Sequence, residues 1–413
     1  MSVTLTVHRA TNQIGGNCIE LRSGTERLVL DVGRPLDAPN DAVGLIPASL
    51  DVSQPATILI SHPHQDHYGL LEEAPADWPV RCGEPTRRLM AITANVTGRT
   101  IPQVIEPWIT GAAITIGPFQ ITPLLTDHSA FDAHMLLIEA EGRRVLYSGD
   151  FRRHGRKSAL VERLMRSPPP EIDVLLMEGT NLGSDKPCVT EDDLEDRFLE
   201  LFRKTPGRVF VAWSAQNVDR TVTIYRACLK TGRTLVVDLY TAEVMEMLAE
   251  FGRLPAPGWR QVKVVMTAGL RRRYGGADGD AFADRMAKLG MSAAALESSN
   301  EPLVVMTRPS LIRDFIRKDV KPTADDAWSW SQWRGYLDNA DGAAVRSWFD
   351  AAGARAEHIH TSGHASPSDL REFSMAMSPK TMVPIHGVKW DEDQAGFPPI
   401  TRLRDGEPLT IGS

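Results

Sequence analysis

The sequence predicts an α/β fold from two observations. Short apolar runs rich in β-branched residues recur along the chain, and amphipathic helical patterns separate several of them. Apolar runs of this kind, closed by a turn or a polar residue, are typical of buried strands. Strands that alternate with helices indicate an α/β architecture. With 413 residues, the chain has room for two or three domains.

The predicted elements can be given by residue number. The predicted strands are 27–31, 57–61, 120–125, 143–147, 173–177, 208–212, 234–238, 262–266, 303–306 and 382–385. A helix is predicted over 191–204, where apolar side chains share one face and Thr190 with Asp193 resembles a capping box. A second helix is predicted over 366–377.

The composition is typical of a globular protein, with 42% hydrophobic and 24% charged residues. No apolar stretch is long enough to span a membrane, and the first residues lack the pattern of a secretory signal. The cysteines lie tens of residues apart, which fits neither a disulfide framework nor a cysteine zinc site. We therefore expect a cytoplasmic protein with buried, reduced thiols at Cys18, Cys82, Cys188 and Cys228.

The net charge of −7 counts against bulk binding of nucleic acid. It does not exclude such binding, because a local basic groove can act inside an acidic protein. One candidate is the basic segment 152–157, and another is the run 271–273 beside Tyr274, whose ring would stack on a base. A charge run is equally typical of a solvated face.

The densest chemical signal directly follows the predicted strand 57–61. His62, His64, Asp66 and His67 fall within one short loop that Pro63 stiffens. Imidazole and carboxylate together suit zinc, with manganese or iron less favoured. Such a loop can direct His62 and His64 to one point and Asp66 and His67 to another, which indicates two metals side by side.

Three more candidate ligands each follow a predicted strand. His128 comes after 120–125, Asp150 after 143–147, and His386 after 382–385. Alone, each histidine is more often an ordinary residue than a ligand. The carboxyl ends of strands are where α/β folds collect functional groups, so their shared placement favours a metal site.

The pattern His62-x-His64-x-Asp66-His67 with the three later ligands resembles the metallo-β-lactamase superfamily, and Asp31 resembles its first motif. The resemblance implies an αββα sandwich that holds two zinc ions, with manganese as the alternative. One ion would be held by His62, His64 and His128, and the other by Asp66, His67 and His386. Asp150 would bridge the ions, with a hydroxide between them as nucleophile, and Asp31 would orient ligands.

Three downstream motifs resemble those of the β-CASP nucleases, and Ser-Gly-His-Ala-Ser is close to the ribonuclease J form. They are Glu178-Gly179-Thr180-Asn181, the segment 361–366 and the segment 383–387. The resemblance implies an α/β insert, with a first lactamase part at 1–190, the insert at 191–345 and a return at 346–413. A histidine at the last motif is similar to the RNA-processing members and favours RNA over DNA.

The same resemblance implies the catalytic residues Asp66, Glu178 and His364. His364 is the candidate acid for the leaving oxygen, and Glu178 would hold its charged form. The helix start near 366 would offer free amides to a phosphate, although its serines equally fit helix capping. The expected substrate contacts are Ser214, Arg308, Ser362, Ala365 and Ser366; Arg308 stands where longer relatives have a Gly-Ser-Gln-Gly type loop.

The sequence therefore favours a dinuclear zinc-dependent phosphodiesterase, and first a ribonuclease acting on single-stranded RNA. Two other functions stay open. One is a hydrolase of a small phosphodiester, nucleotide or thioester, and the other is a non-catalytic scaffold of the same fold. Retention of every ligand position counts against the scaffold, because clustered unpaired polar groups destabilise a core. Exonuclease against endonuclease action is undecided, and a homodimer is among the assemblies left open.

Overall fold

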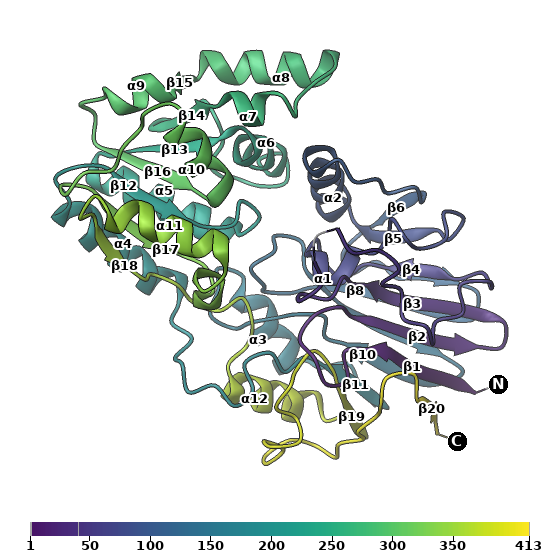
Figure 1. Ribbon diagram of the computed structural model, residues 1–413. Helices are drawn as coiled ribbons and strands as arrows, with labels where there is room; N and C mark the ends of the chain where they lie inside the picture. The colour runs from purple at the N-terminus through teal and green to yellow at the C-terminus, as the bar shows by residue number, and fades with distance from the viewer. Residues whose placement is uncertain (1, 40, 413) are drawn as a thin grey trace. The chain divides into compact units, whose positions relative to one another are not determined.

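The computed structural model describes residues 2–39 and 41–412, and contacts within these residues divide the chain into two compact units. The first unit contains the chain up to Ala94, the segment Gly98–Cys188 and the chain from Gly363 onwards. The second unit contains Asn95–Thr97 and Val189–Ser362. Both units can be followed by colour in Figure 1.

Among the described residues, the first unit holds two mixed sheets. In spatial order the first sheet contains β20 (Pro408–Ile411), β1 (Val3–Arg9), β2 (Cys18–Ser23), β3 (Glu26–Val32), β4 (Thr57–Leu59), β5 (Val80–Gly83) and β6 (Ile105–Trp108). The strands from β20 to β3 pair antiparallel, and those from β3 to β6 pair parallel.

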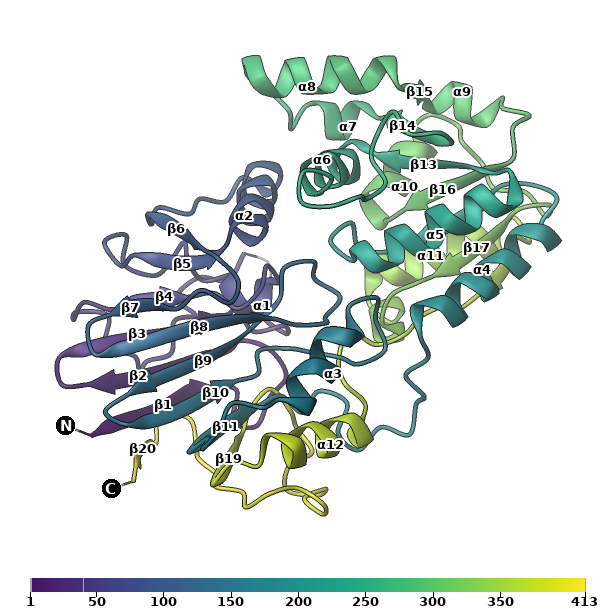
Figure 2. The ribbon, with the colours of Figure 1, turned by 180° about the vertical axis from the view of Figure 1, so that it is seen from behind.

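The second sheet of this unit contains β19 (Thr381–Pro384), β11 (Val174–Met177), β10 (Arg143–Tyr147), β9 (His134–Ala140), β8 (Phe119–Leu125) and β7 (Ile114–Ile116). Figure 2 shows β8, β9 and β10 side by side. Because β9 runs antiparallel to both of its neighbours, β8, β10, β11 and β19 share one direction. Their carboxyl ends therefore meet at one edge of the sheet.

The two sheets pack face to face around one apolar core. Alternate residues of each strand enter that core, such as Leu28 and Leu30 of β3 and Val145 and Tyr147 of β10. The residues between them, such as Leu146, are also buried, against helices on the outer face. Burial on both faces explains why these strands read as continuous apolar runs.

Helices cover the outer face of each sheet. The first sheet is covered by α1 (Gln65–Tyr68) and α2 (Glu84–Thr97), which bury Tyr68 and Met90 against it. The second is covered by α3 (Ser158–Arg166) and α12 (Pro367–Met377), which bury Val161 and Phe373 (Figure 1). This layering is the expected αββα sandwich, so the predicted fold class is confirmed.

The second unit is built on a parallel sheet. In spatial order its strands are β15 (Gly290–Ser292), β14 (Val262–Met266), β13 (Thr234–Asp238), β16 (Leu303–Thr307), β12 (Val209–Ala212), β17 (Ala327–Trp330) and β18 (Arg355–Glu357). Its helices are α4 (Glu191–Lys204), α5 (Val218–Thr231), α6 (Leu239–Leu248), α7 (Ala268–Arg271), α8 (Ala277–Lys288), α9 (Ala293–Glu297), α10 (Pro309–Ile316), η1 (Arg334–Leu337) and α11 (Ala340–Asp350).

The second unit extends further than the insert expected at 191–345. Residue 345 lies inside α11, and β18 beyond it pairs with β17 in the parallel sheet. Sheet pairing therefore holds the chain in this unit as far as Glu357, and the unit ends at Ser362. The sequence carries no signal at that point, because the return to the first unit is a loop between elements of ordinary pattern.

Local predictions agree closely with the structure. Each predicted strand has a counterpart whose ends lie within one or two residues, and the helix 191–204 begins at the predicted capping box of Thr190 and Asp193. The cysteines are free thiols, as expected, but Cys188 is only half-buried. In the part of the chain that the structure describes, no helix is both long and apolar enough to cross a membrane.

Candidate metal centre

The candidate ligands lie together because the strands that carry them end at the same edge. His62 and its loop follow β4. Asp31 lies near the end of β3, which pairs in parallel with β4. His128, Asp150 and His386 follow β8, β10 and β19, which share one direction. Segments hundreds of residues apart in the chain are thus brought to one point.

Three imidazoles form the first ligand group. Nδ1 of His64 lies 3.1 Å from Nε2 of His62 and 3.2 Å from Nε2 of His128. All three ligand nitrogens lie within 4.8 Å of one another. His62 and His128 are buried, and burial lowers the pKa of each well below its usual value. The rings are therefore neutral, which is the state that binds a metal.

A second group combines Asp66, His67, Asp150 and His386. Oδ2 of Asp150 lies 3.1 Å from Nε2 of His67 and 3.8 Å from Nε2 of His386, which in turn lies 3.3 Å from Oδ2 of Asp66. The same Asp150 oxygen is 3.7 Å from Nε2 of His62 in the first group. Asp150 therefore stands between the two groups.

The second ring nitrogen of several histidines is held by a neighbour. Nδ1 of His67 donates to Asp31 at 2.6 Å, and Nδ1 of His128 donates to the carbonyl of Gly363 at 2.6 Å. Nδ1 of His386 lies 2.8 Å from the hydroxyl of Thr180. These contacts fix the ring orientations and leave the other nitrogen of each ring facing the cluster.

Asp31 is itself held firmly. It is fully buried and accepts hydrogen bonds from the Ser61 amide at 2.7 Å and the Tyr147 hydroxyl at 2.6 Å, besides that from His67. Its backbone adopts the left-handed conformation, with φ of 58°. Asp31 is thus both the strand-end turn residue and the partner of a candidate ligand, and such strained positions cluster at functional sites.

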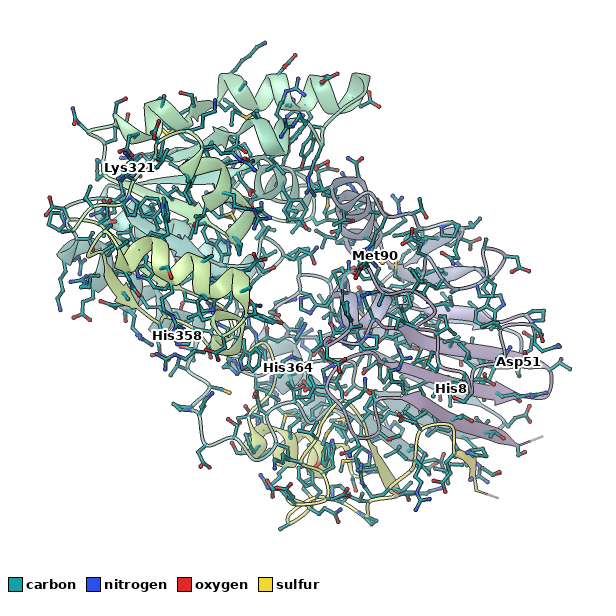
Figure 3. All side chains as sticks on the ribbon, viewed as in Figure 1. His8, Asp51, Met90, Lys321, His358 and His364 are labelled. Atoms are coloured by element: carbon teal, nitrogen blue, oxygen red, sulfur yellow. The ribbon has the colours of Figure 1, made fainter. Side chains whose placement is uncertain are left out.

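A carboxylate and an imidazole flank the ligand groups. Nδ1 of His364 lies 3.0 Å from Oε2 of Glu178 and 3.8 Å from Oδ2 of Asp150. Burial lowers the pKa of His364, but Glu178 and Asp150 outweigh it and raise the value to about 9. The His364 side chain is 20% exposed, whereas that of Glu178 is buried. His364, labelled in Figure 3, is therefore a charged ring with access to solvent.

The comparisons with known proteins agree with this geometry. Residues 11–178 match the model of the metallo-beta-lactamase superfamily, and residues 353–391 match the Zn-dependent metallo-hydrolase RNA specificity domain. Ribonuclease J of Helicobacter pylori (strain B128) is 23% identical over 100% of this chain and 61% of its own length. Residues 11–178 thus match the metallo-β-lactamase superfamily, and the chain is similar to ribonuclease J along its whole length.

Other relatives of this metallo-hydrolase have similar names and similar coverage. Ribonuclease J of Mycobacterium tuberculosis (strain CDC 1551 / Oshkosh) is 26% identical over 80% of the chain and 58% of its own length. The chain thus spans about three fifths of the length of the curated relatives it matches. A crystal structure of a protein of unknown function from Enterococcus faecalis V583 has the same fold, with a TM-score of 0.81, 18% identity, and coverage of 99% and 100% of the two chains.

Several expected substrate contacts of the metallo-hydrolase have partners inside the protein. The Ala365 amide donates to the carbonyl of Phe151 at 2.6 Å, and the Ser366 hydroxyl forms the capping box of α12 with Asp369. The Ser366 amide also donates to Asp369, at 3.3 Å, so the amides of these two residues already have acceptors within the protein and differ from the free amides expected. Ser362 is half-buried and belongs to the second unit.

The other two expected contacts also lie in the second unit. Ser214 is exposed just beyond β12. Arg308 directly follows β16 and forms an ion pair with Asp238, and its guanidinium lies over the Tyr240 ring at 5.2 Å. Arg308 is thus held in place from two sides at the carboxyl edge of the parallel sheet.

The basic runs differ from the expected path for a strand. Arg152 is buried beside Asp127 at 3.4 Å, and Arg153 pairs with three carboxylates. Tyr274 is 1% exposed and donates to Glu243 at 2.7 Å, so it cannot stack on a base. Sequence alone could not reveal these partners, because they come from distant segments.

Sequence reasoning missed residues that hold the ligands in place. Thr180 contacts His386, Tyr147 contacts Asp31, and the Asn181 amide donates to the carbonyls of His364 and Ala365 at 2.9 and 3.0 Å. Thr180 and Asn181 belong to the motif that begins at Glu178, so the signal was present. Tyr147 ends an ordinary buried strand and gave no signal.

Proposed function

We propose that this chain is a dinuclear zinc-dependent ribonuclease. The observation that carries the proposal is the arrangement of two ligand groups around Asp150, with the Glu178–His364 pair beside them. Small-molecule hydrolysis needs neither the acid pair nor a second unit. Assignment of the second unit as the β-CASP insert is part of the same proposal, as is the cytoplasmic location expected from the free cysteines.

The residues present fit a pair of metal ions. Oδ1 of Asp150 is buried and has no hydrogen-bond partner among the described residues, which is costly unless a cation sits against it. Three neutral imidazole nitrogens whose lone pairs face each other at close range also need a shared cation. Nitrogen and carboxylate oxygen donors together suit zinc, with manganese as the alternative.

In this proposal His62, His64 and His128 would hold one ion, Asp66, His67 and His386 would hold the other, and Asp150 would contribute to both. When bound, the ions lower the pKa of water to about 7 and offset negative charge on a phosphoryl group. Asp31, Thr180 and the Gly363 carbonyl keep the imidazoles in the tautomer that coordinates.

His364 is proposed to protonate the oxygen that leaves when the phosphodiester breaks. Its ring is charged, partly exposed and beside the ligand groups, as a general acid requires. Glu178 acts through His364 as a positioning residue, since its carboxylate binds Nδ1 and directs Nε2 away from itself. The amides of Phe151 and Thr180 donate to Glu178 and fix it.

RNA is proposed as the substrate over DNA. The support is the match of 353–391 to the RNA specificity domain and the names of the relatives. His386 adds support for RNA by analogy, because the RNA-processing β-CASP nucleases resemble this chain in having histidine at the last motif. A homodimer stays a prediction, as do the substrate contacts through Ser214, Arg308, Ser362, Ala365 and Ser366.

The test is cleavage of 5′-labelled single-stranded RNA and matching DNA by the metal-loaded chain. We expect RNA to be degraded, and His64→Ala and His364→Ala to be strongly impaired. His358→Ala, a histidine in the second unit, is the matched control and should cleave like the parent. Failure to cut either polymer with metal still bound would overturn the nuclease proposal. Cutting of DNA alone would overturn the choice of RNA.

A further inference from the structure

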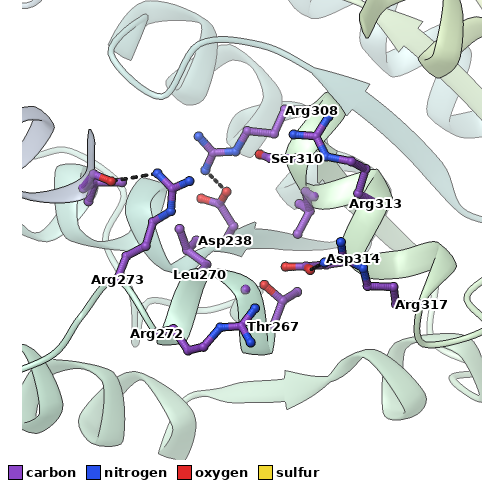
Figure 4. A pocket seen from close by; sticks show the side chains of 13 residues that line it. Asp238, Thr267, Leu270, Arg272, Arg273, Arg308, Ser310, Arg313, Asp314 and Arg317 are labelled. Atoms are coloured by element: carbon purple, nitrogen blue, oxygen red, sulfur yellow. Dashed lines mark hydrogen bonds and ion pairs between the residues drawn. The ribbon is translucent and has the colours of Figure 1, made fainter. Parts of the chain in front are cut away.

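The second unit has a cavity of about 430 Å³ at the carboxyl edge of its parallel sheet. Its wall includes Asp238, Thr267 and Arg308, which end or follow β13, β14 and β16 (Figure 4). The chain leaves β13 towards β14 and leaves neighbouring β16 in the opposite direction, towards β17. Open α/β sheets bind ligands where the strand order reverses in this way.

The cavity is rich in positive charge. Of the residues that the structure describes, five arginines and two aspartates line it, in a chain whose net charge is −7. Both aspartates already have a cation: Asp238 pairs with Arg308, and Asp314 lies 3.2 Å from Arg317. Arg313 pairs with Asp341 at 3.2 Å, and Arg273 donates to the carbonyl of Val96. Arg272 and Arg273 are the lining arginines for which no carboxylate partner is found among the described residues, so the cavity has positive charge in excess of its own carboxylates.

The start of a helix borders the same space. The helix α10 begins at Pro309 without a side-chain cap, and Ser310 and Leu311 of its first turn line the cavity. Amides in the first turn of a helix have no acceptor within the helix. An uncapped helix start beside arginines is a favourable place for an anion.

Thr267 gives an independent indication of a ligand. Thr267 is 5% exposed and lines the cavity, yet its hydroxyl has no hydrogen-bond partner among the described residues. A buried polar group without a partner destabilises the folded state. A ligand with hydrogen-bond acceptors would satisfy this hydroxyl, the two amides and the guanidinium groups together.

We infer that this cavity, the arginine pocket, binds a phosphate group carried either by a free nucleotide or by an RNA strand. Phosphate oxygens accept charge-assisted hydrogen bonds from guanidinium groups, and the volume lies in the range of nucleotide-sized sites. The inference does not rest on the proposed ribonuclease, because no candidate metal ligand lines the pocket.

The test is calorimetric titration of the full, metal-loaded chain with AMP and with a 5′-phosphorylated hexaribonucleotide. Arg272→Ala combined with Arg273→Ala removes the two pocket arginines that have no carboxylate partner among the described residues. Arg271→Ala is the matched control, because Arg271 pairs with Asp280 and Asp284 and does not line the pocket. We expect the double variant to weaken binding about tenfold or more, and the control to leave it unchanged.

The two probes separate the sources of phosphate. AMP binding that the double variant weakens assigns a free nucleotide, whereas loss confined to the hexaribonucleotide assigns an RNA strand. Equal binding by the double variant and the control overturns the inference, as does absence of binding by the parent. Repeating the series with His64→Ala in every protein removes phosphate binding at the metal centre from the comparison. Loss of binding at the arginine pocket can then be distinguished from loss of binding at the metal centre.

Thr267→Val is a second variant that tests the pocket even if the double variant fails to fold. It replaces the unpartnered hydroxyl by a methyl group of similar size, so the fold should be kept or slightly stabilised. We expect weaker binding of the same probe with an unchanged or raised melting temperature. Unchanged binding would mean that no ligand reaches this hydroxyl, which contradicts the inference.

Discussion

The metal centre of the first unit and the arginine pocket of the second both lie where parallel strands end. They differ in how their polar groups are balanced. In the metal centre, Asp31, Thr180 and the Gly363 carbonyl each hold one nitrogen of a histidine whose other nitrogen faces the cluster. In the arginine pocket, the carboxylates are already paired and arginines remain in excess.

Because of this difference, the two regions suit ligands of opposite charge. A centre of neutral imidazoles and carboxylates is prepared for cations, and its supporting hydrogen bonds fix the geometry before they bind. A cavity of guanidinium groups and uncapped amides is prepared for an anion. Substitutions in each region test this difference.

The largest effect is expected for Asp150→Asn. The substitution keeps the shape but removes the charge that lies between the two ligand groups. RNA cleavage should fall by at least about 10³-fold, with loss of bound metal. Elemental analysis of the purified variant and a cleavage assay measure the two losses. Full metal content with full activity would show that Asp150 joins no metal site.

A smaller effect is expected for His364→Ala, with metal content unchanged. Loss of the proposed acid should lower kcat about 10²-fold. Glu178→Gln should lower kcat less and move the basic limb of the pH profile to lower pH, because Glu178 raises the pKa of His364. A pH profile that is unmoved by Glu178→Gln would contradict the positioning role.

Thr180→Val tests the support of a single ligand. The valine cannot contact Nδ1 of His386, so the ring loses one of its constraints. Metal affinity should fall about tenfold, measured by competition with a chelator. Thr381→Val, whose hydroxyl contacts Thr401 away from the ligand groups, is the matched control. Equal affinities of the two variants would argue against Thr180 as a supporting residue.

The smallest effect concerns the stability of the first unit. Burial raises the pKa of Glu20, but hydrogen bonds from His8 and Arg27 outweigh it and lower the value to about 2. The charged Glu20 therefore stabilises the fold at pH values above its ordinary pKa near 4.5. This contribution is lost as the pH falls towards 2. Its size is roughly 3 kcal/mol at most.

Urea unfolding of Glu20→Gln measures this contribution. The variant should be less stable than the parent near neutral pH, and the difference should shrink in acid. Glu301→Gln removes an exposed pair with Lys263 in the second unit and should change little at either pH. A difference between parent and Glu20→Gln that does not depend on pH would contradict the linkage.

Much of the fold could be predicted because its signals are local. Strands buried on both faces read as apolar runs, as β11 and β13 do, and the capping box at Thr190 and Asp193 marks the start of α4. The candidate metal ligands could be found in the sequence because four of them share one loop. The others each follow a strand, and the direction of that strand decides where they lie.

The sequence by itself determined ten of the described strands, the helices α4 and α12 and the candidate ligands, and its resemblance to a known superfamily implied the αββα sandwich. Only the tertiary structure decided which polar groups are already used, such as Arg152 by Asp127, Tyr274 by Glu243 and the Ala365 amide by Phe151. It also decided that Thr267 shares one cavity with Arg308, Arg313 and Arg317. The physical reason is that periodicity and capping act over a few neighbouring residues, whereas burial and pairing join residues that only the packed sheets bring together.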